Sequence, residues 1–216
     1  MYKACVFDLD GTLTDTLESL TFSVNKTLKE IGLGQISAEQ CRSFVGNGAA
    51  VLVEKSIRAA GDPGAEKLEE AKRTYAGIFG EFCTYKVKPY DGIPELLESL
   101  KAEGIRMAVV SNKPHEQTKD VVRTFFAEGT FDEVQGQSDQ YPRKPDPSAV
   151  YAVLERMGVS PEEAVYVGDS EVDMKTGKAA GMLTVGVTWG FRSEEVLLET
   201  GADRTIDHAA ELLKLF

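Results

Sequence analysis

The chain opens with a short, mostly apolar run, residues 2–8, that ends in Asp8 and is followed closely by Gly11. A run of this length that stops at a glycine is typical of a buried strand. Apolar residues then recur at helical spacing until Gly32, which provides a stop signal. The apolar positions of this helix are Leu17, Leu20, Val24, Leu28 and Ile31. The pattern predicts one strand that leads directly into a helix.

Helical patterns continue to residue 82, and no strand pattern interrupts them. Ser37 and Gln40 have the spacing of a capping box, which predicts a second helix that ends near Gly46. Two more helices are expected over residues 49–60 and 65–82. This stretch is long enough to form a small helical domain of its own.

Helix and strand alternate from residue 89 onward. The expected helices cover residues 93–103, 114–126, 147–157, 172–180, 193–200 and 209–215. The expected strands cover residues 105–110, 131–134, 164–167 and 183–187, with a short one at 205–206. Alternation of this kind predicts right-handed crossovers and an α/β fold with a doubly wound parallel sheet, to which the first strand also belongs. We therefore predict a core of residues 1–14 and 83–216 and an inserted helical cap domain of residues 15–82.

Composition and charge narrow the range of partners. The chain has 216 residues and a formal net charge of -11, which argues against binding to nucleic acid or to an anionic membrane. It has neither a signal-peptide pattern nor an apolar run long enough to span a membrane. Three scattered cysteines, Cys5, Cys41 and Cys83, are typical of reduced thiols. We expect a cytoplasmic protein, either a monomer or a homodimer.

Polar side chains follow the predicted strands at the points where the strands end. Because ligands collect at the carboxyl ends of parallel strands, these side chains are the candidate site. They are Asp8 and Asp10 after the first strand, Ser111 and Asn112 after the second, Asp169 and Asp173 after the fourth, and Lys144 in a loop. The sequence thus brings four carboxylates and one lysine to a single sheet edge.

Carboxylates this close repel one another, and a bound cation relieves that repulsion. Mg²⁺ prefers oxygen ligands, which Asp8 and Asp169 would supply from neighbouring strands, with a backbone carbonyl near Asp10 as a third. No histidine or cysteine ends a predicted strand, which weighs against zinc. The sequence therefore predicts a magnesium site formed by Asp8, Asp10 and Asp169.

This constellation fits phosphoryl transfer. Asp8 is the expected nucleophile, giving an aspartyl-phosphate, and Asp10 is the expected acid and base. Lys144 adds a second cation, and Asp173 is expected to orient Lys144 or a metal-bound water. The residues expected to hold the phosphate oxygens are Thr12, Ser111, Asn112 and Lys144.

The motifs that carry these residues resemble those of a known superfamily. They are DLDGT at 8–12, SN at 111–112, Lys144 within RKPDP, and GDSEVD at 168–173. Their order and placement are similar to the four motifs of the haloacid dehalogenase superfamily, phosphatase branch. The resemblance implies a Rossmann-like core, Mg²⁺, an aspartyl-phosphate intermediate and a mobile helical cap of the first type. Because true dehalogenases lack the second aspartate, Asp10 favours phosphoryl transfer.

The substrate is expected to depend on the cap. The cap stretch RSFVGNGAAV at 42–51 is similar to the cap loop of phosphoglycolate phosphatases, as is SNKP at 111–114. The expected substrate is therefore 2-phosphoglycolate, a small phosphorylated metabolite, which would yield glycolate and phosphate. In this interpretation the substrate is contacted by backbone amides and one side chain, from Gly46, Asn47 and Gly48. A plain helix–helix turn would account for the same residues. The candidate partners of a substrate carboxylate are Arg42, Lys113 and Arg192, each of which is also readable as a solvated or structural cation.

Other functions stay open at this point. A pyrophosphatase or a broad sugar-phosphate phosphatase would carry the same core motifs. A β-phosphoglucomutase-like isomerase is less favoured because the cap has no histidine. A phosphate-sensing protein without catalysis is disfavoured because it would typically lack Asp10 or Lys144, and both are present.

Overall fold

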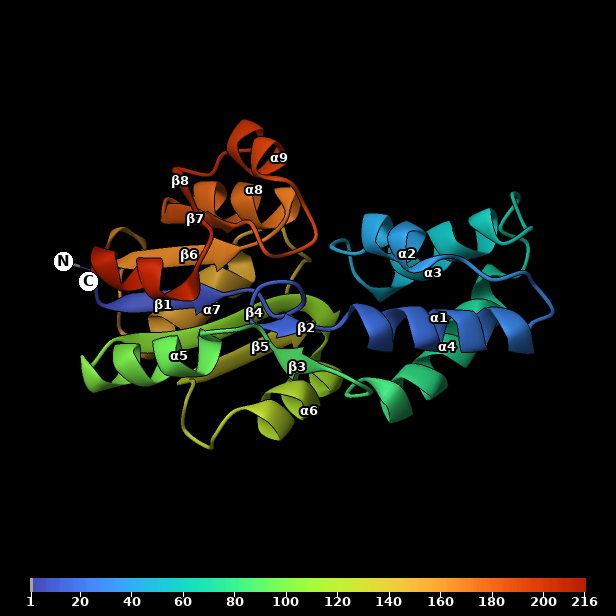
Figure 1. Cartoon of the computed structure of the whole chain (residues 1–216), viewed down its shortest axis with the longest axis horizontal. Helices are drawn as coiled ribbons and strands as arrows, with labels where there is room; N and C mark the ends of the chain where they lie inside the picture. Colours follow the sequence, from blue (N-terminus) through green and yellow to red (C-terminus); the bar gives the residue numbers. More distant parts are fainter. Residues whose placement is uncertain (1) are drawn as a thin grey trace.

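A six-stranded parallel sheet forms the centre of the larger half of the molecule. The computed structural model describes residues 2–216 and orders the strands β5-β4-β1-β6-β7-β8 (Figure 1). Their bounds are β1 Ala4–Phe7, β4 Arg106–Pro114, β5 Glu133–Gln137, β6 Ala164–Gly168, β7 Leu183–Val187 and β8 Arg204–Ile206. Strand β1 pairs in parallel with β4 on one side and β6 on the other. The predicted α/β class is confirmed, and β1 lies inside the sheet.

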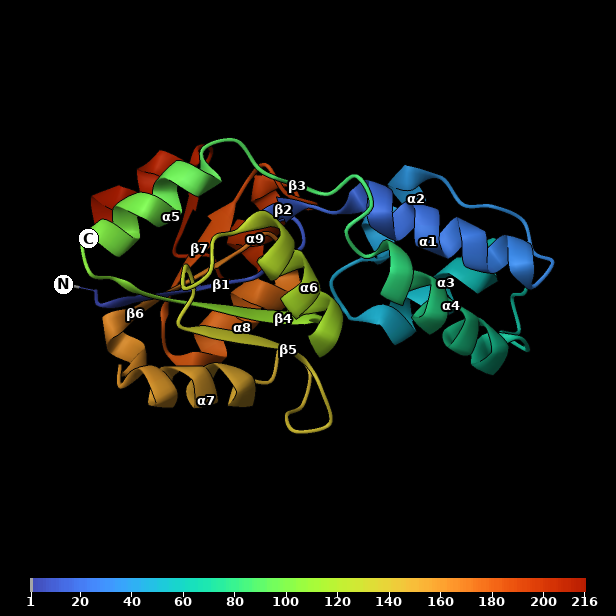
Figure 2. The same ribbon diagram turned by 90° about the horizontal axis from the view of Figure 1, so that it is seen from below.

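Helices cover both faces of this sheet. Figure 2 shows α5 and the C-terminal 3-10 helix on one face and α7 on the other. One apolar cluster joins α5 and α6 to the sheet, and a second joins α7 and α8 to it. The bounds are α5 Ile93–Ala102, α6 His115–Phe125, α7 Ser148–Met157, α8 Glu171–Ala180, α9 Glu194–Glu199, and the 3-10 helices Pro161–Glu163 and Ala209–Leu215. No helix within residues 2–216 is long and apolar enough to cross a membrane.

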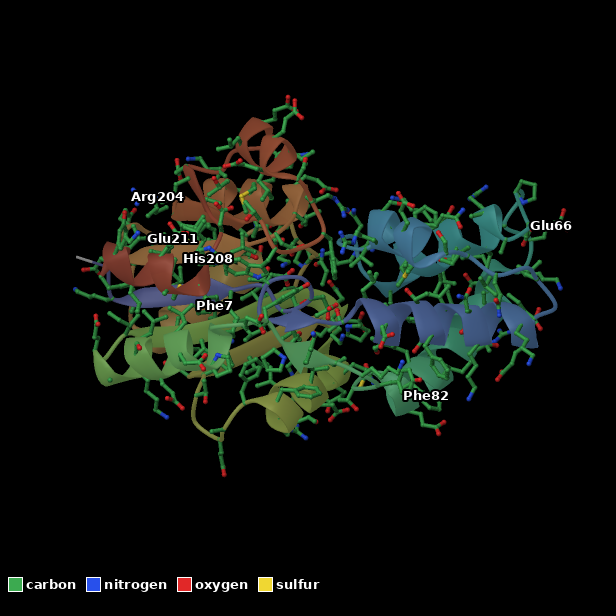
Figure 3. All side chains as sticks on the ribbon, viewed as in Figure 1. Phe7, Glu66, Phe82, Arg204, His208 and Glu211 are labelled. Carbon is green, nitrogen blue, oxygen red and sulfur yellow. The ribbon has the colours of Figure 1, made fainter. Side chains whose placement is uncertain are left out.

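Four helices form a separate unit beyond the carboxyl ends of the strands (Figure 1). They are α1 Leu17–Glu30, α2 Ala38–Phe44, α3 Ala49–Ala59 and α4 Leu68–Phe82. They surround an apolar cluster of their own, in which Leu28, Cys41 and Ile57 are almost completely buried. The predicted capping box of Ser37 and Gln40 is present at the start of α2. Figure 3 shows Glu66 at the end of this helical unit that lies farthest from the sheet.

A small antiparallel ribbon joins the helical unit to the sheet. It consists of β2 (Thr14–Asp15) and β3 (Lys88–Pro89), so both connections between the two parts run side by side. Strands of two residues leave no periodic pattern, which is why the sequence did not reveal them. The predicted domain boundaries, at 14/15 and 82/83, lie near this ribbon, and the division into two domains stays a prediction.

Two element predictions are corrected by the structure. Strand β5 spans Glu133–Gln137, later than the predicted 131–134, because its polar residues Gln135 and Gln137 hide it from an apolar pattern. Strand β4 continues to Pro114 instead of ending at Val110. The SN motif at 111–112 therefore lies within the end of a strand, which fixes the direction of its side chains.

Candidate active site

Asp8 lies just beyond the end of β1, at the middle of the sheet edge that faces the helical unit. Its carboxylate is almost completely buried and forms an ion pair with Lys144, with 2.9 Å between Oδ1 and Nζ. Apart from this ion pair, Asp8 Oδ1 has no hydrogen-bond partner among residues 2–216. Burial and the negative charge of Asp173 raise the pKa of Asp8 to about 7, although Lys144 acts in the opposite direction.

Lys144 is a buried cation with three close polar neighbours. Its Nζ pairs with Asp8 at 2.9 Å and with Asp173 at 2.7 Å, and it donates to the carbonyl of Val110 at 3.0 Å. Burial lowers the pKa of Lys144, but the charges of Asp173 and Asp8 outweigh it, so the pKa lies well above its usual value. Lys144 therefore stays charged and is held in one position.

Three carboxylates form a cluster at this edge. One carboxylate oxygen from each of Asp8, Asp169 and Asp173 lies within 4.8 Å of the others, and all three residues are buried. Burial and the charges of Asp173 and Asp8 raise the pKa of Asp169 well above its usual value. A set of oxygen donors with excess negative charge suits a hard divalent cation. The described residues therefore fit a metal site of this kind.

The three carboxylates differ in how far their oxygens are already occupied. Asp173 accepts from Lys144 at 2.7 Å, from the Ser170 hydroxyl at 2.6 Å and from the Tyr166 hydroxyl at 3.3 Å. Asp169 accepts from Thr12 Oγ1 at 3.1 Å and from the backbone amide of Phe191 at 2.8 Å. Asp173 is thus committed to protein donors, and Asp8 and Asp169 keep more free acceptor capacity.

The backbone after Asp8 turns away through Gly11. Gly11 has a φ of +89°, and a Cβ at this position would lie 2.3 Å from Asp169 Oδ2. Only glycine allows Asp169 to approach the turn this closely. The carboxylate of Asp10 lies outside the cluster and pairs with the ammonium of Lys113 at 2.9 Å. If Asp10 binds the metal, its ligand atom would therefore be the backbone carbonyl oxygen, and this role stays a prediction.

The residues predicted to hold phosphate oxygens are brought to the same edge, and some of their side chains are already engaged. Asn112 Nδ2 donates to the carbonyls of Lys144 at 3.1 Å and Gly46 at 3.0 Å, and Asn112 Oδ1 accepts from the Lys144 amide at 2.9 Å. The hydroxyl of Ser111 accepts from the Lys113 amide at 3.3 Å. Asn112 therefore connects the Lys144 loop to the helical unit.

A small cavity of about 40 Å³ lies between the sheet edge and the helical unit. The sheet edge contributes polar residues, namely Asp8, Asp10, Ser111, Asn112, Lys113, Asp169 and Ser170. The helical unit contributes apolar and aromatic residues together with two glycines, namely Leu20, Val45, Gly46, Gly48, Ala49, Leu52, Tyr75 and Phe79. A cavity of this size and lining suits a small polar molecule covered by an apolar roof.

The loop after α2 is held by side chains from the sheet half. Arg192 Nη2 donates to the carbonyl of Val45 at 2.8 Å, and Arg143 Nη1 donates to that of Asn47 at 2.9 Å. Of the predicted cap residues, Gly46 and Gly48 line the cavity, whereas Asn47 is not among its lining residues. The predicted contact between the Asn47 side chain and a substrate thus finds no support in the lining of the cavity.

The three cations considered for a substrate carboxylate have different surroundings. Lys113 is buried and lines the cavity. Arg192 also lines it but is occupied by Glu171 at 2.8 Å and by carbonyls of the loop. Arg42 is exposed and lies over the ring of Phe191, with 6.0 Å to the centroid. Lys113 is therefore the candidate with the best access to a bound molecule.

Neither histidine joins the carboxylate cluster. His115 Nδ1 accepts from the backbone amide of Gly136 at 3.2 Å. His208 lies beside the C-terminal 3-10 helix, well apart from the helical unit (Figure 3). Two other residues at the site were not found by sequence reasoning, Tyr75 and the backbone amide of Phe191, because neither follows a strand in a recognisable motif.

The comparisons with known proteins cover nearly the whole chain. The model of the haloacid dehalogenase-like hydrolases matches residues 5–187. The chain belongs to this family. Its relatives include the phosphoglycolate phosphatase of Aquifex aeolicus, which is 35% identical over 99% of this chain and 96% of that protein. The phosphoglycolate phosphatase of Haemophilus influenzae Rd is 33% identical over 99% of this chain and 98% of that protein.

Solved structures of hydrolases in this family share the fold. The crystal structure of a predicted phosphoglycolate phosphatase from Haemophilus somnus has a TM-score of 0.91 and 32% identity, covering 99% of this chain and 97% of that one. This single superposition includes both the sheet half and the helical unit, because it covers 99% of this chain. The arrangement of sheet and helical unit described above is thus shared with this structure.

Proposed function

We propose that this chain is a Mg²⁺-dependent phosphatase that hydrolyses 2-phosphoglycolate to glycolate and phosphate through a covalent intermediate on Asp8. The observation that carries the proposal is the position of Asp8. Its carboxylate is buried at the end of a central strand, beside Lys144 and Asp169, and faces a small covered cavity. The choice of substrate rests on relatives named phosphoglycolate phosphatase that match over almost their full length.

The cation would be held chiefly by Asp8 and Asp169. Their oxygens have the most free acceptor capacity, since Asp173 already accepts from Lys144, Ser170 and Tyr166. The backbone carbonyl of Asp10 is the proposed third protein ligand. When bound, the ion supplies positive charge that neutralises phosphoryl oxygens and relieves the repulsion within the carboxylate cluster.

The reaction proceeds in two steps. A carboxylate oxygen of Asp8 attacks phosphorus, the bond from phosphorus to the glycolate oxygen breaks, and that oxygen takes a proton from Asp10. Asp10 then accepts a proton from water as the water attacks the phosphorus of the aspartyl-phosphate, which releases phosphate and restores Asp8. Lys144 holds Asp8 in place throughout and opposes the charge that develops on the phosphoryl group.

The helical unit of residues 15–82 acts as the cap in this proposal. Its apolar roof excludes water from Asp8 while the phosphoryl group is transferred. Opening would proceed about the β2–β3 ribbon, which carries both connections to the sheet half. The substrate is a small phosphorylated metabolite, and we place the enzyme in the cytoplasm as a monomer or homodimer.

The test is a phosphate-release assay over a panel of small phosphoesters, with Mg²⁺ and with a chelator. We expect 2-phosphoglycolate to be the best substrate and release to require Mg²⁺. Asp8→Asn is expected to abolish release, while Asp91→Asn, at an exposed position, keeps it. A uniformly weak profile would contradict the substrate, and near-normal turnover by Asp8→Asn would contradict the covalent step.

A further inference from the structure

The two buried lysines at the sheet edge differ in their remaining capacity to donate hydrogen bonds. Lys144 donates hydrogen bonds to Asp173 and to the carbonyl of Val110, and it also forms an ion pair with Asp8. Lys113 is equally inaccessible, with 1% of its side chain exposed, yet within residues 2–216 its ammonium donates only to Asp10, at 2.9 Å. An ammonium group has three donors, and leaving them unpaired in a buried place is costly. Lys113 therefore has donors available to a molecule in the cavity that it lines.

A second residue that carries an unpartnered polar group, Tyr75, lines the same cavity. Tyr75, from α4, is 3% exposed, and its hydroxyl has no hydrogen-bond partner among the described residues. Its ring stacks on that of Phe79, with 5.0 Å between centroids. The ammonium of Lys113 lies 4.8 Å from the centroid of Phe79. Lys113, Phe79 and Tyr75 thus form a continuous row along one wall.

We infer that Lys113 and Tyr75 form the subsite for a second anionic group of the substrate, a carboxylate, at the end away from the phosphoryl group. This inference rests on the proposed phosphatase function. Lys113 would supply the charge and Tyr75 a hydrogen bond to the other oxygen. The rest of the roof is apolar and includes Leu20 and Leu52, so it would exclude a further hydrated charged group. The cap thus contributes a residue that selects the substrate.

A carboxylate fits this wall better than a second phosphoryl group does. The cavity is small, about 40 Å³, and the two residues of the proposed subsite carry one ammonium and one neutral hydroxyl. That pair matches a single negative charge shared by two oxygens. Arg192, the other cation lining the cavity, is already occupied by Glu171 and by the carbonyl of Val45.

The experiment compares two substrates that differ only at the distal end, 2-phosphoglycolate and 2-hydroxyethyl phosphate. The variants are Lys113→Met and Tyr75→Phe, and the readout is the ratio of the two kcat/KM values. Lys113→Met is expected to lower this ratio by about 10- to 100-fold, and Tyr75→Phe by about 3- to 10-fold, mainly through KM for 2-phosphoglycolate. Since the Tyr75 hydroxyl has no hydrogen-bond partner within residues 2–216, Tyr75→Phe should not lower the melting temperature.

The controls are Lys55→Met and Tyr85→Phe, two exposed residues outside the cavity lining, and both should keep the wild-type ratio. Equal losses on both substrates in Lys113→Met would show that this lysine only positions Asp10, and would overturn the inference. An unchanged ratio in Tyr75→Phe would remove Tyr75 from the subsite. A wild-type enzyme that cleaves neither substrate would instead overturn the proposed function, before any variant is compared.

Discussion

Lys144 is the cation on which the buried carboxylates depend, so its removal tests the electrostatic account of the site. Lys144→Met keeps an unbranched chain of similar length and deletes the charge. Asp8 and Asp173, whose side chains are 11% and 0% exposed, then lose a partner at 2.9 Å and 2.7 Å. Removing one partner of a buried ion pair costs about 3–5 kcal/mol. For a chain of this size, that corresponds to a fall in melting temperature on the order of 10 °C.

The assay is thermal or urea unfolding in the presence of a chelator, with Lys178→Met as the matched control. Lys178 pairs with Asp203 at the same 2.7 Å, but its side chain is 47% exposed. Exposed pairs contribute about 0–1 kcal/mol. A large loss is therefore expected at Lys144 and a small one at Lys178. If the two variants lost the same stability, the claim that burial makes the Lys144 network strong would be refuted.

Three further predictions follow from the same geometry. Burial raises the folded-state pKa of Asp8 from 3.8 to about 7, so the metal-free protein should lose stability as pH rises through this window. The rise in melting temperature caused by Mg²⁺ should therefore be larger at pH 8 than at pH 5, and an equal rise at both pH values would contradict this prediction. Gly11→Ala places a Cβ 2.3 Å from Asp169 and should lower kcat by at least about 100-fold. The control Gly104→Ala lies at a position that also has positive φ but has open space around it, so it should lower only stability. Equal activity in the two variants would contradict the claim that catalysis requires the close approach of Asp169 to Gly11. Arg192→Leu removes the bonds to the cap loop and should raise KM more than it lowers kcat in steady-state assays, and an unchanged KM would show that the loop is held without it.

The sequence predicted the parts of this molecule in which one physical pattern dominates. The apolar run before Asp8 and the helix–strand alternation after residue 89 made the parallel sheet predictable, because both reflect burial between two helical layers. The candidate residues followed from a single topological rule, that the carboxyl ends of parallel strands meet at one edge. The structure places Asp8, Asp169 and Asp173 together there.

Contacts between distant segments were not predictable in the same way. The pairing of Lys113 with Asp10 joins residues 103 positions apart, and no local pattern marks it. Tyr75 has the spacing of an ordinary buried helix residue, so only the folded structure shows that it lines the cavity and that its hydroxyl lacks a partner among the described residues. Asn47 stays a prediction that rests on the motif alone, because its neighbours Gly46 and Gly48 line the cavity and Asn47 is not among the lining residues.

The most direct test of the central claim is detection of the phosphoryl group on Asp8. The enzyme would be mixed with 2-phosphoglycolate and Mg²⁺, quenched in acid during turnover, digested and analysed by mass spectrometry. The account predicts that the peptide containing Asp8 gains the mass of one phosphoryl group, and that Asp8→Asn shows none. Rapid phosphate release with Asp8 never modified, or the same modification at Asp10, would contradict it.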